Sequence, residues 1–194
     1  MGSSLAPWDC DPPNTSISPG DSLCEGKGDI RFGHAHWTIL SRMRSWLMKS
    51  EPDCYGIDDL EREGVGMWEG CRNYAVRNFL RDSMAVGDRA FFYHSNAAPT
   101  GIVGWMEVAS EAYPDPTQFD PKSEYFDPKA TPESPRWYAR DMRFRERFRG
   151  VVTLAQLKAT PGLEDMAVTK KGQMLSITPV TDAEWEIVMG LASG

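Results

Sequence analysis

The sequence predicts an α+β fold, in which short, mostly antiparallel strands form a curved sheet or partly closed barrel with helices around it. Strand-like and helix-like segments are interspersed without the regular alternation of a doubly wound sheet. The 194 residues suffice for one ordinary domain with a core. A hydrophobic fraction of 41% and a charged fraction of 25% are typical of globular chains, which fits this prediction.

The first 42 residues differ in composition from the rest of the chain. They are rich in Pro, Gly, Ser and Asp and lack a periodic apolar pattern, so they bury too little surface to offset the entropy of ordering. We therefore expect residues 1–42 to be a disordered N-terminal extension and residues 43–194 to form the domain. Met43, where the composition changes, is a candidate for the true start of translation.

The spacing of apolar residues predicts the elements of the domain in order. The predicted elements are a strand at 45–49, a helix at 56–64, a helix at 72–84, a turn and strand at 86–95, a strand at 101–113, a strand at 137–148, a helix at 153–163, a strand at 172–180 and a final helix at 181–193.

Local signals support these assignments. Asp58 and Asp59 favour the first turn of the first helix, and Gly64 favours its end. Gly104 predicts either a bulge or a close backbone approach within its strand. Thr181 is the expected N-cap of the last helix, with Glu184 at the capping-box position. The helix at 72–84 has a core-facing stripe of Ala75, Val76, Phe79, Leu80 and Met84.

The segment 113–137 is a long loop with six prolines. The motif FDPK occurs twice in it, at 119–122 and 126–129, and Asp before Pro favours turn geometry. Its aromatic residues predict that the loop packs down on the domain. Because long ordered loops in compact domains are often functional, we expect a role for this one.

Composition restricts the function classes. A net charge of −7 argues against generic polyanion binding, unless basic residues cluster locally. The four cysteines and three histidines lack zinc-ligand spacing, so we expect no metal and no cofactor. The cysteines are expected to be reduced thiols, and the sequence has no apolar run of about 18–20 residues and no secretory signal. We therefore expect a cytoplasmic location and no membrane partner. We also expect a monomer.

Catalytic motifs are missing from the sequence. There is no nucleophile elbow, no P-loop and no dinucleotide-binding glycine motif. His94 is the only histidine in residues 43–194, and a catalytic pair would have to join it to Cys54, Cys71 or Ser95. We therefore predict a non-catalytic protein, with an enzyme that uses His94 as an open alternative.

Four short segments instead combine small polar groups with aromatic residues, at 49–52, 68–74, 93–96 and 135–138. Serine, asparagine and backbone amides can read the edge of a planar heterocycle, while tryptophan stacks on its face. A pocket for one flipped base needs these parts. The alternative is that Trp68 and Trp137 are core residues, and that the polar residues are caps and turns.

An arginine ladder follows these segments. Residues 136–149 contain six arginines against Asp141 and Glu146, a local balance of +4. With period two, Arg143, Arg145, Arg147 and Arg149 share one strand face, and Met142, Phe144 and Phe148 share the other. The arginine face is either a phosphate track or a solvated face paired with acidic residues of the neighbouring strand.

Seven collinear motifs resemble the EVE domain family over residues 45–191. They are WLMKSEPDCYGIDDL, MWEGCRNYAVRNFLR, GDRAFFYHSN, GIVGWMEV, AYPDPTQFDPKSEYFDPKA, PRWY and LSITPV with a following EW. The resemblance implies a PUA-like pseudo-barrel with peripheral helices, similar to thymocyte nuclear protein-like domains and related to YTH domains. Cys71 and Met174 depart from the family pattern, which usually has valine and arginine there.

The resemblance also implies a function. EVE domains are expected to recognise a modified base, either a modified cytosine or a methylated adenine, in DNA or RNA through an aromatic pocket, with a separate effector protein as a possible partner. By the match to YTH domains, Trp68 is a wall of the pocket and Lys49 and Ser50 flank it. A small-molecule or nucleoside pocket is the alternative on the same fold.

Residue type and resemblance together define the expected site. The predicted base-binding residues are Lys49, Ser50, Trp68, Gly70, Cys71, Asn73, Tyr93, His94, Ser95, Asn96, Trp105 and Trp137. The predicted phosphate-binding residues are Arg72, Arg77, Arg143, Arg145 and Arg147. Tyr93, Trp105 and Trp137 are the candidates for a second wall opposite Trp68.

Overall fold

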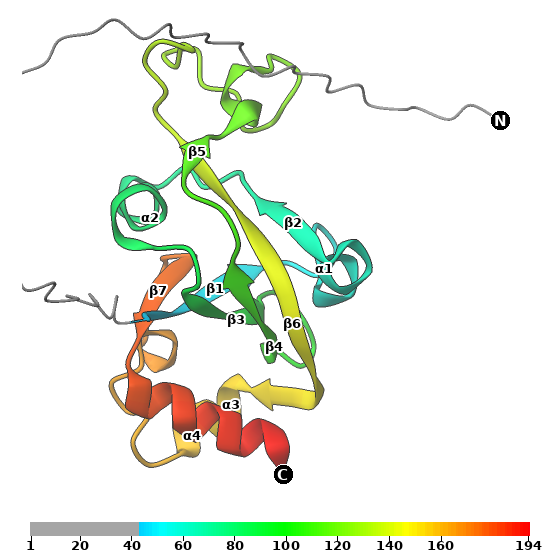
Figure 1. Cartoon of the computed structure of the whole chain (residues 1–194). Coiled ribbons are helices and arrows are strands. Elements are labelled where there is room, and N and C mark those ends of the chain that lie inside the picture. Colours follow the sequence, from blue (N-terminus) through cyan, green and yellow to red (C-terminus); the bar gives the residue numbers. More distant parts are fainter. Residues whose placement is uncertain (1–42) are drawn as a thin grey trace, which may run out of the picture. The chain divides into compact units, whose positions relative to one another are not determined.

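A computed structural model describes residues 43–194, so the disorder expected for residues 1–42 lies outside the described residues. The predicted α+β class is confirmed (Figure 1). The strands are β1 (Ser45–Ser50), β2 (Val65–Trp68), β3 (Arg89–His94), β4 (Gly101–Val108), β5 (Tyr113–Pro114), β6 (Tyr138–Thr153) and β7 (Ile177–Val180).

The sheet is open and has the order β2-β6-β4-β3-β1-β7, with the short β5 added to β6. Its pairs are antiparallel except for β1 and β3, which run parallel. The strand β6 has 16 residues and pairs with β2, β4 and β5 along its length, and it continues beyond the predicted end at residue 148 to Thr153. The mostly antiparallel pairing is thus as expected, while the two edges, β2 and β7, remain unjoined in the sheet order.

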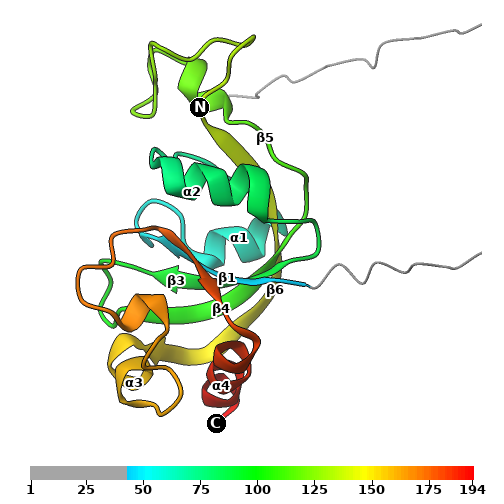
Figure 2. The same cartoon turned by 90° about the vertical axis from the view of Figure 1, so that its left-hand side faces the viewer.

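Helices cover both faces of the sheet (Figure 2). The helical elements are α1 (Ile57–Glu63), α2 (Tyr74–Asn78), the π-helical η1 (Phe79–Ser83), the 3-10 turns η2 (Pro116–Phe119) and η3 (Ala167–Thr169), α3 (Leu154–Ala159) and α4 (Asp182–Ser193). On one face, α1, α2 and η1 pack on a first core cluster, which includes Trp46, Phe92 and Trp68. On the other face, α3 and α4 pack on a second cluster around Phe91 and Trp185. None of the helices in residues 43–194 is long and apolar enough to span a membrane.

Several predicted local features are confirmed. Thr181 Oγ1 accepts from the Glu184 amide at 3.3 Å, and the Glu184 carboxylate accepts from the Thr181 amide at 2.7 Å, which completes the capping box of α4. Asp58 and Asp59 lie in the first turn of α1, and Gly64 ends it. These features depend on contacts within one turn, which is why a local pattern predicts them.

Other predictions were wrong. The expected helix at 72–84 is divided into α2 and η1, and Arg72 lies outside it. The strand β2 was not predicted, because four residues with two exposed side chains give too short a pattern. The strand expected at 172–180 begins only at Ile177.

The face assignment within β6 was also wrong for Phe148. The pairing of β4 with β6 shifts register between Trp105 and Met106, so Arg145 is an extra residue in β6. Phe144 therefore packs on the first core cluster and Phe148 belongs to the second. Gly104 lies beside this irregularity, where a Cβ atom would be 2.3 Å from the Glu146 carbonyl oxygen, so the predicted close approach is present.

The long loop, residues 115–137, connects β5 and β6 and is folded onto itself. The carboxylates of Asp120 and Asp127 each accept from the amide two residues later, at 2.9 Å, so both FDPK motifs form turns. The buried Gln118 amide group binds backbone atoms at both ends of the loop, including the Trp137 carbonyl oxygen at 2.9 Å. This internal bonding explains how a long loop keeps one conformation.

Candidate functional site

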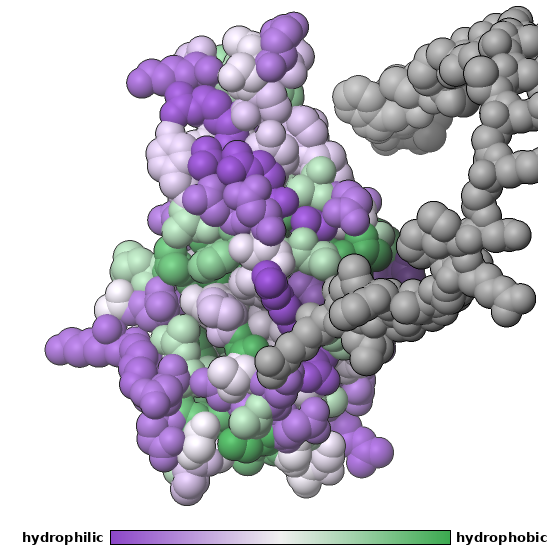
Figure 3. Space-filling model, turned by 60° about the vertical axis from the view of Figure 1, so that its left-hand side comes forward, coloured by the Kyte–Doolittle hydropathy of each residue, from purple (hydrophilic) through white to green (hydrophobic). Residues whose placement is uncertain are grey.

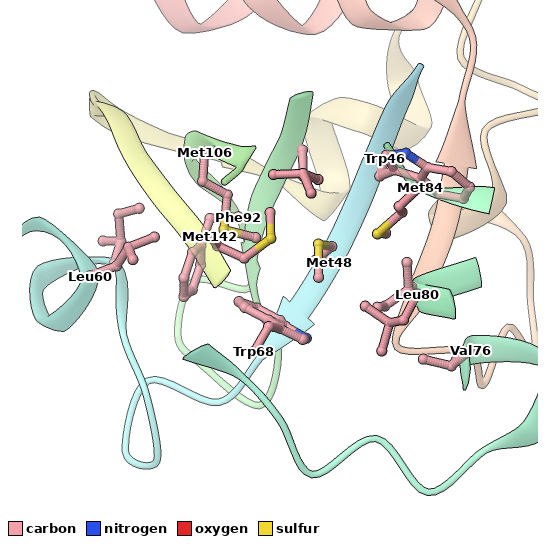
Figure 4. Close-up of a cluster of buried hydrophobic side chains, with 14 of the residues drawn as sticks. Trp46, Met48, Leu60, Trp68, Val76, Leu80, Met84, Phe92, Met106 and Met142 are labelled. Atoms are coloured by element: carbon pink, nitrogen blue, oxygen red, sulfur yellow. The ribbon is translucent and has the colours of Figure 1, made fainter. Parts of the chain in front are cut away.

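Trp68 ends β2 and belongs to the first core cluster. Its ring meets that of Phe92 edge to face, with centroids 5.4 Å apart, and only 6% of the residue is exposed. Figure 4 shows Trp68 beside Met48 and Phe92 at the margin of this cluster. From Trp68 the chain continues along the margin toward α2. Trp68 is thus a core residue first, as one of the two interpretations held, and a base can stack on its ring only after neighbouring groups move.

The turn after Trp68 brings the long loop to this margin. Gly70 has a φ of +74°, and its amide donates to Asp115 Oδ2 at 3.0 Å. A Cβ atom on Gly70 would lie 2.8 Å from the ring of Tyr125, so only glycine fits both the backbone angle and this contact. Tyr125, which is absent from the predicted site, therefore lies against the turn; the aromatic content of the loop was the only signal for it.

Arg72 fastens the long loop to the turn. Its Nε and Nη2 donate to the Tyr125 carbonyl oxygen at 2.8 and 2.6 Å, Nη1 to Asp115 Oδ2 at 2.7 Å, and Nη2 also to Thr117 Oγ1 at 2.9 Å. Its guanidinium also lies over the rings of Tyr125 and Trp137. Because four of its five N–H groups are engaged, the structure gives Arg72 a structural role in place of the predicted phosphate contact.

Asp115 is the buried partner of Arg72. Burial alone would raise the pKa of Asp115, but hydrogen bonds from Arg72, Thr117 and the Gly70 amide outweigh burial and hold the pKa below its ordinary value. The Arg72–Asp115 pair is therefore ionised at neutral pH and joins the turn to the loop.

Cys71 is the residue of the turn that packs against the first core cluster, to which Trp68 belongs. Burial, above all, raises the pKa of its thiol to about 11, and the nearby side chains of Ser176 and Trp68 oppose this rise. Lys49 lies close by, since its amide donates to the Ser176 carbonyl oxygen at 2.8 Å and its Nζ to the Gln173 carbonyl oxygen at 3.4 Å. Neutral thiol, hydroxyl and indole groups thus meet at the margin of the core.

Asn73 caps α2 through its side-chain oxygen, which is therefore not available to a base edge. Its Oδ1 accepts from the amides of Ala75 at 2.9 Å and Val76 at 3.3 Å. This is the cap-and-turn alternative for the polar residues, and it also engages amides that would otherwise face an anion.

A second polar group gathers at the ends of the parallel strands β1 and β3. Ser50 Oγ donates to the Tyr55 carbonyl oxygen at 2.7 Å, Ser95 Oγ to the Ser50 carbonyl oxygen at 3.2 Å, and Asn96 Nδ2 to Glu51 at 2.7 Å. These bonds shape the turn at residues 51–56. Ser50, Ser95 and Asn96 thus lie together, and the structure uses their side chains to hold the backbone.

His94 belongs to the same group. Its Nε2 accepts from the Ile57 amide at 3.1 Å at the start of α1, and burial, above all, lowers the pKa of the imidazole. Within residues 43–194, neither Cys54, Cys71 nor Ser95 is hydrogen-bonded to His94, and no group of residues is arranged to hold a metal ion. The geometry therefore gives His94 a helix-capping role.

Tyr93 and Trp105 lie on the opposite face of the sheet from Trp68. Tyr93 is part of the second core cluster, and Trp105 packs against that cluster and meets Trp185 edge to face at 5.8 Å. These two residues cannot form the wall opposite Trp68. The face of a side chain depends on strand register, which the sequence did not reveal.

Trp137 is also enclosed, but near the turn. Its Nε1 donates to Asp127 at 2.8 Å, its ring lies 5.0 Å from that of Tyr74, and the residue is buried. Of the candidates for a second wall, Trp137 alone lies beside the Gly70–Asn73 turn, because the guanidinium of Arg72 lies over its ring.

The arginine ladder is largely paired. Arg145 donates to Glu107 at 2.6 and 3.1 Å, and Arg147 Nη1 lies 2.7 Å from Asp58 of α1. Arg143 is exposed and makes no ion pair in the part of the chain that the structure describes. For Arg145 and Arg147 the solvated-face alternative is therefore the better account, and the predicted phosphate track lacks support.

Comparison with known proteins identifies the family and supports the fold. The model of the EVE domain matches residues 44–191. Thymocyte nuclear protein 1 from Danio rerio is 38% identical over 184 residues, covering 85% of this chain and 79% of the relative. A crystal structure from Pseudomonas syringae is 47% identical with a TM-score of 0.74, covering 76% of this chain and 99% of that one.

A further solved structure carries a ligand. It is the human THYN1 protein in complex with 5-methylcytosine-containing DNA, which is 39% identical with a TM-score of 0.70 and covers 78% of this chain and 98% of that one. A family match over most of the described residues, with relatives of this identity, is decisive. The chain belongs to the EVE domain family.

Proposed function

We propose that this protein binds DNA that carries a modified cytosine, with 5-methylcytosine as the first candidate, and does so without catalysis. The observation that carries this proposal is the human THYN1 structure with 5-methylcytosine-containing DNA, which aligns over 98% of its length with this chain. The shared family and fold support the same ligand class for this protein.

The base site that we infer lies at the margin between Trp68 and the Gly70–Asn73 turn. Trp68 offers a ring for stacking, and the neighbouring Cys71 and Ser176 offer neutral polar groups. Tyr125 lies against Gly70, and in place of Tyr93 and Trp105 it is the aromatic ring that the long loop brings to this turn. Because Trp68 is 6% exposed, binding includes a displacement of the side chains that cover it.

Binding should be measured with oligonucleotides that differ in one base. We expect DNA with one 5-methylcytosine to bind more tightly than the same DNA with cytosine, in both single- and double-stranded forms. Arms with N6-methyladenine, and the same series in RNA, test the other bases and the other polymer. Equal affinity of the wild-type protein for methylated and unmethylated DNA would overturn the proposal.

A pair of tryptophan variants locates the site. Trp68→Leu keeps an apolar side chain and removes the stacking surface, so affinity for the modified DNA should fall about 5- to 150-fold. Trp105→Leu is the matched control, since it removes a tryptophan from the opposite face. Circular dichroism checks that both variants fold. An equal loss of affinity in the two variants would refute the assignment of Trp68.

A further inference from the structure

A column of aromatic rings and guanidinium groups runs from the Gly70 turn to the surface of α2. The Arg72 guanidinium lies 5.4 Å from the Tyr125 ring centroid and 5.5 Å from that of Trp137. Trp137 lies 5.0 Å from Tyr74, and the Arg77 guanidinium lies 4.8 Å over the Tyr74 ring. Tyr125, at the inner end, contacts Gly70, two residues after Trp68.

The outer end of this column is exposed. Tyr74 is 50% exposed, although its ring is held by Trp137 from within, and Arg136 approaches it from the long loop. The Arg136 guanidinium also donates to the Tyr74 hydroxyl group. In Figure 3, hydrophilic side chains gather on the upper part of this face, at the height that α2 and the long loop have in Figure 1.

The cations at this end are available. Arg77 donates through Nε and Nη2 to the neutral Asn78 Oδ1, at 3.1 and 2.7 Å, and within residues 43–194 it makes no ion pair. Arg136 has a single acidic partner, Asp127, at 3.4 Å. The neighbouring Arg81, by contrast, is paired with Asp82 at 2.7 Å. Arg77 and Arg136 are therefore the guanidinium groups of this face that can exchange a weak contact for a phosphate.

We propose that Tyr74, Arg77 and Arg136 form a second subsite, which holds the phosphodiester and the base next to the modified base. An exposed aromatic ring between arginines is the arrangement that binds a nucleic-acid strand without reading its sequence, through stacking and phosphate contacts. The column links this subsite to the turn beside Trp68. This inference deepens the proposed function and rests on it only for the position of the modified base.

The test compares two double variants of equal charge change. Arg77→Gln with Arg136→Gln removes the subsite cations, and Arg145→Gln with Arg147→Gln removes two arginines that are already paired with carboxylates. Affinities for methylated and unmethylated DNA are measured from about 50 to about 200 mM salt, a range over which affinity falls by about 10³–10⁵ for proteins that bind many phosphates.

We expect the subsite variant to bind both DNAs more weakly by the same factor, with an unchanged preference for the methylated base. Its plot of log affinity against log salt should be shallower by about 0.9 for each duplex phosphate that the variant no longer neutralises, and by about 0.7 on single strands. The ladder variant should keep the wild-type slope. Tyr74→Leu should weaken single-stranded binding about 5- to 150-fold.

The outcomes separate the two proposals. An unchanged slope in the subsite variant, or the same change in both double variants, would overturn the subsite. A wild-type protein without preference for the methylated base, whose salt slope still depends on Arg77 and Arg136, would overturn the base-recognition function and keep the subsite. A wild-type protein that binds no nucleic acid would overturn both.

Discussion

The two arginine-rich regions of this domain differ in what their guanidinium groups touch. Along β6, Arg145 and Arg147 lie beside carboxylates of β4 and α1. Around α2 and the long loop, Arg72, Arg77 and Arg136 lie over aromatic rings, and Arg77 makes no ion pair within the described residues. The carboxylates that pair with Arg145 and Arg147 come from other elements, so a dense run of arginines in the sequence does not by itself provide free charge.

Arg140 on β6 extends this comparison to the interior. It is 1% exposed and donates to the carbonyl oxygens of Leu80, Met84 and Ser110. Burial lowers its pKa, which Glu111 and Asp88 partly oppose. The guanidinium group of Arg140 therefore holds η1, the element that follows α2, in place. Arginine thus has a different role in the core, in the long loop and on the surface of this domain.

The largest effect is expected for Arg140. Replacing it in Arg140→Met leaves three carbonyl groups at a buried position without their donor, so the free energy of unfolding should fall by at least about 3 kcal/mol. Urea unfolding measures this loss. Arg149→Gln, on the exposed part of the same strand, should change stability by less than about 0.5 kcal/mol. A similar result for both variants would show that the carbonyl contacts of Arg140 contribute little.

A pH effect of intermediate size is expected for the Arg72–Asp115 pair. The folded-state pKa of Asp115 is lowered, so its contribution to stability is complete above the ordinary carboxylate pKa of about 4. That contribution declines as pH falls below this value and is lost below the folded-state pKa. Limited proteolysis of the long loop from pH 7 to pH 3, with an acid-stable protease, should show increasing cleavage.

Two variants sharpen this pH prediction. Asp115→Asn lacks the titrating group, so its loop should be cleaved more readily at neutral pH and with less dependence on acid. Arg77→Gln leaves the Asp115 network intact and should follow the wild type. If cleavage of the loop in Asp115→Asn depended on pH as it does in the wild type, another carboxylate would have to account for the loss of loop stability in acid.

The smallest effect is expected for the ladder. Arg145→Gln or Arg147→Gln removes an exposed or partly exposed ion pair, worth less than about 1 kcal/mol. Thermal unfolding at low and high salt measures the contribution of the ion pair to stability. The difference in stability between variant and wild type should shrink at high salt, because salt screens the pair. A loss larger than that of Arg140→Met would reverse the ranking of the buried and the exposed arginines of β6.

Much of the domain followed from the sequence alone. The capping box of α4, the acidic first turn of α1, the two FDPK turns and the close approach at Gly104 were predicted correctly. The order of the motifs was sufficient to indicate the family, which the comparison then confirmed. The cap and the turns depend on residues within one turn of each other, and the family on a linear order that the chain keeps when it folds. The close approach at Gly104 is a contact between strands, which the glycine itself indicated because it has no side chain.

The composition of the site was decided by the tertiary structure. Register and an irregularity in β6 placed Phe148 on the other core cluster, and they separated Tyr93 and Trp105 from Trp68. The long loop occupied Arg72 and placed Tyr125 at the turn, across 53 positions of sequence. Whether an arginine is available to a ligand depends on which carboxylates and rings surround it in space, and no local pattern records those neighbours.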